Sequence, residues 1–186
     1  TETAIDPHVH SVSGHESPLE ELLAAPAADN LSITGWLVCL HNTRLGASHP
    51  SFRIESAFGQ PHDHGLCPSN PEVRTYLGSI AEALASLGID AIGLEAIGFP
   101  SAFHGHGDQF GHEKTQVVAS PREEALFSQC FCDACRAAAD FDIDTAQSVV
   151  QERCRTILET PEDTVPSLSA VVEDHPVLEA LFTFRA

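Results

Sequence analysis

Three cysteines fall within six residues, Cys130-Phe131-Cys132-Asp133-Ala134-Cys135, directly before an alanine-rich run. A tetrahedral Zn²⁺ takes four soft ligands, and this C-x-C-x-x-C spacing can bring three of them to one point on a tight turn. The best placed fourth donor is Cys67, in a loop that precedes a predicted helix. The spacing therefore predicts a structural zinc site formed by Cys67, Cys130, Cys132 and Cys135, with a binding free energy on the order of 10 kcal/mol.

The simpler interpretation of these cysteines is a set of reduced thiols that fill a small core. A disulfide framework fits poorly, because only Cys39 and Cys154 remain to pair with the other four. Six cysteines with metal-like spacing favour a reducing compartment, and we expect a cytoplasmic protein.

A second group of possible metal ligands lies near the start of the chain, in the D-x-H-x-H pattern of Asp6, His8 and His10. Two histidines at i and i+2 on a strand face the same side and can share a metal. Over about thirty residues this stretch resembles the opening of the polymerase-and-histidinol-phosphatase type of metallo-phosphoesterase. The Asp-His pair of that family is missing after the next strand, and the alternative is a solvated segment, irregular over 1–17, with incidental histidines.

Further histidines lie in a glycine-rich stretch after the second predicted strand, where His104, His106 and His112 are followed by Glu113. Together they can form a catalytic metal site with an open position, which would indicate a metal-dependent phosphoesterase or amidohydrolase. Imidazoles and carboxylates also hydrogen-bond sugar hydroxyls, so substrate binding is an equal alternative. The third interpretation is a surface loop without a ligand.

The sequence predicts that a strand, a helix and a second strand position these residues. Residues 31–40 and 89–97 are almost wholly apolar, which is typical of strands buried on both faces. Between them, 71–87 carries an apolar stripe at helical spacing with Gly88 just past its end. These spacings predict a parallel βαβ unit. Residues 41–70 read as a long polar loop, and helices are predicted over 18–25, 143–158 and, broken, 167–184.

Composition narrows the range of functions. A chain of 186 residues fits one soluble domain, and no apolar run approaches the 18 residues of a membrane span. There are 27 acidic residues against 9 basic ones, for a formal net charge of −18. Such a surface repels nucleic acids and anionic membranes. Strong acidity with one lysine, Lys114, is similar to proteins from salt-loving archaea, where salt screens the repulsion.

One further resemblance covers about 36–139. The run from Trp36 through His41-Asn42-Thr43-Arg44, the Leu66-Cys67-Pro68 loop, the strand ending Leu94-Glu95 and the C-x-C-x-x-C cluster resemble uncharacterised TIM-barrel proteins of glycoside hydrolase type. The same order of a cysteine loop, a strand ending in Glu and a cysteine cluster is similar to the zinc-containing β-galactosidases of glycoside hydrolase family 42.

That resemblance implies zinc binding by the four cysteines and an acid/base role for Glu95. Independently, Glu95 is the lone ionisable group of an apolar strand, near the end at which βα barrels place their chemistry. Burial there would raise the pKa of Glu95, as a general acid requires. The other interpretation is a structural Glu95 paired with Arg44 or Arg53. The family-42 enzymes carry Asn before this Glu, whereas this chain has Leu94.

The sequence thus predicts an α/β protein of TIM-barrel type, partial or shortened, with a long zinc-pinned loop after its second strand. Two strands are far fewer than the eight of a complete barrel, and the second carboxylate of a glycosidase is not identified. The predicted activity is general acid-assisted cleavage of glycosidic bonds by Glu95. Substrate contacts are expected from His41, Asn42, Arg44, His104, His106, His112 and Glu113. A barrel fragment that only binds carbohydrate is the remaining alternative.

Overall fold

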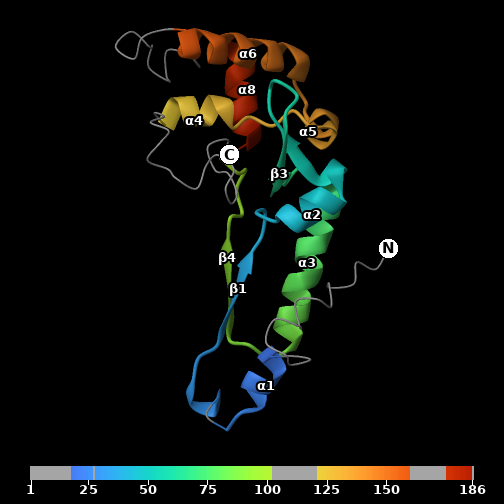
Figure 1. Ribbon diagram of the computed structural model, residues 1–186, viewed down its shortest axis with the longest axis vertical. Coiled ribbons are helices and arrows are strands. Elements are labelled where there is room, and N and C mark those ends of the chain that lie inside the picture. Colours follow the sequence, from blue (N-terminus) through green and yellow to red (C-terminus); the bar gives the residue numbers. More distant parts are fainter. Residues whose placement is uncertain (1–17, 27, 102–120, 160–174, 186) are drawn as a thin grey trace.

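The computed structural model describes residues 18–26, 28–101, 121–159 and 175–185 (Figure 1). Its strands are β1 (Thr34–Val38), β2 (Arg53–Glu55), β3 (Pro61–Leu66) and β4 (Ala91–Glu95). The α-helices are α1 (Pro18–Ala24), α2 (Thr43–Ser48), α3 (Pro71–Ser86), α4 (Pro121–Phe127), α5 (Asp133–Ala138), α6 (Ile143–Glu159) and α8 (Pro176–Arg185). Two short 3₁₀ turns are η2 (Ala28–Asn30) and η3 (Pro50–Phe52).

β1 and β4 form a parallel pair, as the sequence predicts, with α3 preceding β4 in the connection between them. The register runs from Thr34 opposite Ala91 to Val38 opposite Glu95. The pairing continues past the strand ends, where the backbone N–H of Leu40 donates to the carbonyl of Ala96 at 3.0 Å. The C-terminal ends of both strands therefore lie together at one edge of the sheet.

Helix α3 is defined at both ends by its sequence. The Asn70 side chain caps the N-terminus by accepting from the backbone N–H of Glu72 at 2.8 Å, and Pro71 occupies the first helical position. At the other end Gly88 adopts a left-handed backbone conformation, φ +81°, which glycine tolerates at no steric cost. The predicted helix over 71–87 is confirmed to within one residue.

Among the described residues only one face of the β1–β4 sheet is covered, and Trp36, Val38 and Leu94 are exposed, so the expectation of fully buried strands is wrong. Leu37 is 9 % exposed and packs in a cluster with the apolar stripe of α3, whereas Trp36 on the opposite face is 75 % exposed. A Cβ added at Gly35, two residues before Leu37, would lie 2.7 Å from the Ile89 side chain and 3.8 Å from Leu84 of α3, which places helix α3 against this face. The apolar composition of the strands fits two covered faces, but the described residues supply a cover for one.

The predicted polar loop over 41–70 contains regular structure. Helix α2 is followed by an antiparallel hairpin of β2 and β3, with an irregularity between Arg53 and Ile54. α2 lies directly on β3, because a Cβ at Gly46 would come within 2.1 Å of the carbonyl oxygen of Asp63. The prediction of a loop is therefore wrong for most of this stretch.

Two apolar clusters make up the core. One lies between the β1–β4 sheet, α3 and the start of the hairpin. The other joins α4, α5, α6 and α8 to the tip of the hairpin. It contains five of the six cysteines, namely Cys67, Cys130, Cys132, Cys135 and Cys154. Leu66 belongs to the first cluster and Cys67 to the second, so the two cores meet at this point of the chain.

The class of fold is mixed α and β, and the strands of the described residues form two separate two-stranded sheets. The predicted helices over 18–25 and 143–158 correspond to α1 and α6, and α8 overlaps the predicted tail over 167–184 and ends one residue beyond it. None of the helices in the described ranges is long and apolar enough to cross a membrane.

The cap of α3 generates a stability prediction. Asn70 is buried, and besides capping the helix its Nδ2 donates to the carbonyl of Ser51 at 3.0 Å. Replacing Asn70 by Ala should lower the free energy of unfolding by about 2 kcal/mol, because a cap and a buried hydrogen bond are both lost. Thr75→Ala, at an exposed position of the same helix, is the control and should cost less than about 0.5 kcal/mol. Urea titration followed by circular dichroism measures both, and equal midpoints for the two variants would contradict the assignment.

Candidate metal centre

Cys67 lies between the end of β3 and the cap of α3, on a segment held by backbone hydrogen bonds. Its N–H donates to the carbonyl of Phe52 at 2.7 Å, and its own carbonyl accepts from the N–H of Asn70 at 3.1 Å. The guanidinium of Arg74 adds a bond to the carbonyl of Pro68 at 2.8 Å. The thiol is therefore held by a hairpin on one side and by a helix N-terminus on the other.

The other three thiols come from the turn between α4 and α5. Cys132 is the residue before α5 and Cys135 lies in its first turn. The turn is attached to strand β2, because the N–H of Phe131 donates to the carbonyl of Glu55 at 2.8 Å. The N–H of Glu55 in return lies 3.4 Å from the Cys130 sulfur, with which it forms a hydrogen bond.

All four thiols converge on one buried point. Their Sγ atoms lie within 4.8 Å of one another, with Cys67 3.5 Å from Cys135 and 4.0 Å from Cys130. A tetrahedral site with metal–sulfur bonds of about 2.3 Å has sulfur atoms about 3.8 Å apart, which lies between these two distances. A disulfide needs about 2.05 Å, and all six cysteines are free. The structure thus brings together the four predicted cysteines in a group that can hold a metal ion.

The thiols of this group share their protons. Hydrogen bonds that Cys130 and Cys135 donate lower the pKa of Cys132, and the pKa of Cys130 is raised chiefly because its thiol donates to Cys132. The thiolate is the form that binds metals. The arrangement therefore already favours a thiolate at Cys132, stabilised by its neighbours, and a metal ion would displace the remaining protons.

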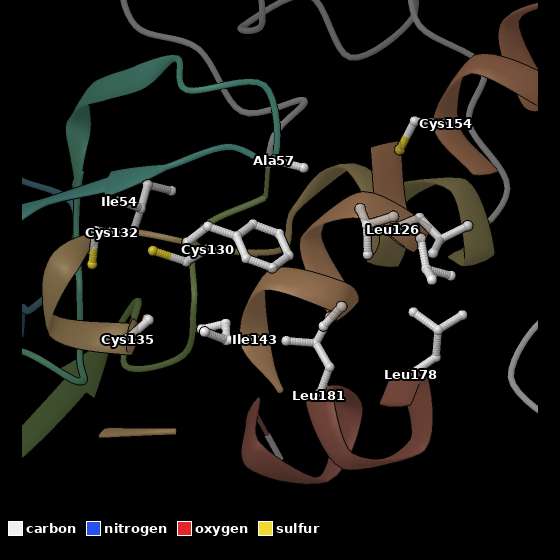
Figure 2. Close-up of a cluster of buried hydrophobic side chains, with 14 of the residues drawn as sticks. Ile54, Ala57, Leu126, Cys130, Cys132, Cys135, Ile143, Cys154, Leu178 and Leu181 are labelled. Carbon is white, nitrogen blue, oxygen red and sulfur yellow. The ribbon is translucent and has the colours of Figure 1, made fainter. Parts of the chain in front are cut away.

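Cys39 and Cys154 stand apart from the group. Figure 2 shows Cys154 at the far end of the helical cluster from Cys130, Cys132 and Cys135. Burial raises the pKa of Cys154 to about 12 and also raises the pKa of Cys39. These two cysteines are apolar core residues.

Glu95 lies at the C-terminal end of β4, as predicted, but its expected burial is wrong because the side chain is exposed. Its register partner Val38 is 41 % exposed on the face opposite α3. The proposed structural partner Arg53 forms its ion pair with Asp63 instead. The residue after Glu95, Ala96, adopts φ +52°, a left-handed conformation that is unfavourable for alanine.

The residues expected beside Glu95 have mixed environments. The Asn42 side chain caps α2 by accepting from the N–H of Leu45 at 2.9 Å, so its oxygen is already used. Arg44 is exposed on α2 and His41 is half-buried after β1. The predicted ligands His8, His10, His104, His106, His112 and Glu113 lie outside the described residues.

A row of histidines beside the strand ends was not predicted as a group. The ring of His41 lies 5.4 Å from that of His64, which lies 5.8 Å from that of His62. Burial lowers the pKa of His62, against the opposing effect of Asp63. The alternation of His62 and His64 along one strand was the available signal, but the hairpin that carries them was not recognised.

Comparison of the chain with protein-family models, with curated proteins and with solved structures finds no match. The site is therefore interpreted from its own geometry.

The lone cysteines generate a prediction about reactivity. At pH 8 Cys154 is protonated in the folded protein, since its pKa of about 12 lies well above that pH, and the thiolate is the nucleophile. Iodoacetamide should therefore leave Cys39 and Cys154 unlabelled in the native protein and label all six cysteines in urea. Peptide mass spectrometry measures the labelling. Native labelling of Cys154 at the rate seen in urea would show that its burial is misassigned.

Proposed function

We propose that this chain is a zinc protein whose metal is held by Cys67, Cys130, Cys132 and Cys135 and has a structural role. The observation that carries the proposal is the convergence of four buried sulfur atoms at tetrahedral spacing. Four protein ligands leave no open coordination position for a water or a substrate, which is the pattern of structural zinc sites. A set of four thiolates also suits iron, so the identity of the metal is part of the test.

The proposed zinc would join two parts of the molecule at the centre of the buried cluster that they share. Cys67 comes from the hairpin and α3 side, and the other three cysteines come from the helical side. The binding free energy of such a site, about 10 to 16 kcal/mol, is as large as the whole stability of a typical domain. On this proposal, metal binding determines whether the helices α4, α5, α6 and α8 pack against the hairpin of β2 and β3.

Metal analysis with a matched pair of cysteine variants tests the proposal. The purified protein should contain one zinc, and Cys132→Ser should lose it and unfold at a lower temperature. Cys154→Ser makes the same chemical change at a buried cysteine outside the group and should keep the metal. Replacement of the histidines of the chain should also leave the zinc in place. Full zinc content in Cys132→Ser would sink the site, and one iron in place of zinc would correct the metal.

The second proposal concerns catalysis and rests on the orientation of Glu95. Leu37 and Gly35 face α3, so Trp36, Val38 and the register partner of Val38, Glu95, lie on the opposite face. In a βα barrel the helices lie outside and the face opposite to them points into the barrel. We propose that the β1–α3–β4 unit is part of a barrel of TIM type and that Glu95 is the proton donor of a glycoside hydrolase.

Three features support this second proposal. The parallel pair has Glu95 at the C-terminal end of its strand, where barrels carry their chemistry. The face of the β1–β4 pair opposite α3 is apolar and exposed, with Trp36 75 % exposed. This is unusual for a parallel sheet, which is normally covered on both faces. The backbone of Ala96, next to Glu95, is held in a conformation of a kind that gathers at functional sites.

Substitution of Glu95 tests the catalytic role. Glu95→Gln should reduce the turnover of aryl glycosides by a factor of about 10² to 10⁴, the usual contribution of a general acid. Glu82→Gln, on the exposed side of α3, is the matched control and should have no effect. Rates are measured over a range of salt concentrations, because the net charge of −18 makes salt a variable of stability. Equal rates for Glu95→Gln and the unaltered protein would remove Glu95 from the mechanism without affecting the zinc proposal.

A further inference from the structure

A pocket of about 390 Å³ lies between the segment that follows β4 and helices α4 and α8. Its volume falls in the range of small-molecule sites. Its walls include two residues after β4, two in or just after α4, and two of α8: Phe99, Ser101, Glu124, Gln129, Phe182 and Arg185. None of these residues belongs to the metal site or to the strand end that carries Glu95.

Arg185 is the main hydrogen-bond donor of the pocket. Its guanidinium carbon lies 3.9 Å from the centre of the Phe99 ring, and one of its N–H groups donates to the carbonyl of Ser128. Within the described part of the chain no carboxylate forms an ion pair with this guanidinium. A guanidinium has five N–H donors in a fixed plane, so others are available to a ligand.

Acceptors lie on the α4 side of the pocket. Gln129 is 4 % exposed, and its Nε2 donates to the carbonyl of Ala125 at 2.6 Å. Its amide oxygen is buried and accepts no hydrogen bond from any residue that the structure describes. A buried carbonyl without a partner is unfavourable by about 1 to 3 kcal/mol, so a ligand hydroxyl that reaches it gains affinity. Glu124, which is exposed, adds a carboxylate at the rim.

The charges around the pocket favour a neutral ligand over an anion. Burial lowers the pKa of Arg185 to about 10, so the guanidinium still carries its positive charge near pH 7. An incoming anion would meet Glu124 as well as the net charge of −18.

A sugar meets these requirements, since each hydroxyl both donates and accepts and the ring has apolar faces. We propose that this pocket binds a neutral monosaccharide or disaccharide, whose hydroxyls accept from Arg185 and donate to Gln129 and Glu124 while its ring packs against Phe182. The proposal requires neither a catalytic Glu95 nor a particular metal in the cysteine site.

Calorimetric titration of the full chain, loaded with metal, tests the pocket with galactose, glucose and lactose as probes. At least one of them should bind. Arg185→Leu should weaken that binding about tenfold or more, because hydrogen bonds to a charged group are lost. Glu124→Leu should weaken it as well, by several-fold. Arg155→Leu is the matched control, because Arg155 lies outside the pocket, 5.5 Å from the centre of the Phe58 ring. The affinity of this variant for the sugar should be unchanged.

Glu124→Leu keeps the test decisive if Arg185→Leu does not fold, because Glu124 is exposed. The same variant also distinguishes a site for neutral sugars from a site for anions, for which glucuronate and inorganic phosphate are the probes. Loss of the carboxylate should weaken a neutral sugar and strengthen an anion. Failure of all three neutral sugars to bind, or equal affinity in Glu124→Leu, would overturn the proposal. Binding of the anions alone, tighter in Glu124→Leu, would also overturn it and define an anion site.

Discussion

The structure depends on the meeting of four thiols contributed by two remote parts of the chain. Sulfur atoms at 3.5 to 4.0 Å in a buried volume are too far apart for disulfides and lie in direct contact as free thiols. The backbone around them is arranged to hold this geometry, because hydrogen bonds attach the Cys67 segment to η3 and the cysteine turn to β2. Hairpin, helix α3 and helix α5 are therefore positioned by one common point.

The hairpin is the second means of contact between the two parts. Its turn presents the carbonyl of Ala57 to α6, where Gln147 and Gln151 both donate to it at 2.7 and 2.6 Å. On the same turn Phe58 lies beneath the guanidinium of Arg155. These contacts are formed by the turn of the hairpin, whereas the cysteine group lies at the end of β3 and is buried. The contacts of the hairpin turn orient α6 relative to the hairpin, and the contacts between the sulfur atoms fix the distance between the Cys67 segment and the turn before α5.

The sequence was informative where the signal is local. Three cysteines in six residues and the capped apolar stripe of α3 each lie within one element, so the cysteine group and this helix could be predicted. The hairpin could not, because the strand Pro61–Leu66 has polar side chains where alternation would require apolar ones. The exposed face of β1 could not be predicted either. The apolar composition of a strand shows that both of its faces could be buried. It does not show whether another element of the chain covers each face.

The candidate sites divide in the same way. The cysteine ligands are recognisable from chemistry and spacing, whereas the pocket lined by Phe99, Gln129 and Arg185 draws on three elements with no shared motif. Glu95 is an intermediate case. Its position at a strand end follows from the sequence, but its exposure depends on tertiary packing that no local pattern encodes.

Cys67 and Cys130 are separated by 63 positions, and the segment between them includes α3 and β4. Bringing these two cysteines together on folding closes a loop of this length, which costs conformational entropy. Since the entropy of loop closure grows only with the logarithm of length, doubling the segment would cost only about 0.6 kcal/mol. Insertions between the two cysteines are thermodynamically inexpensive as long as the four sulfur atoms still meet. The cysteine group thus places little entropic limit on the length of the connections on either side of α3 and β4.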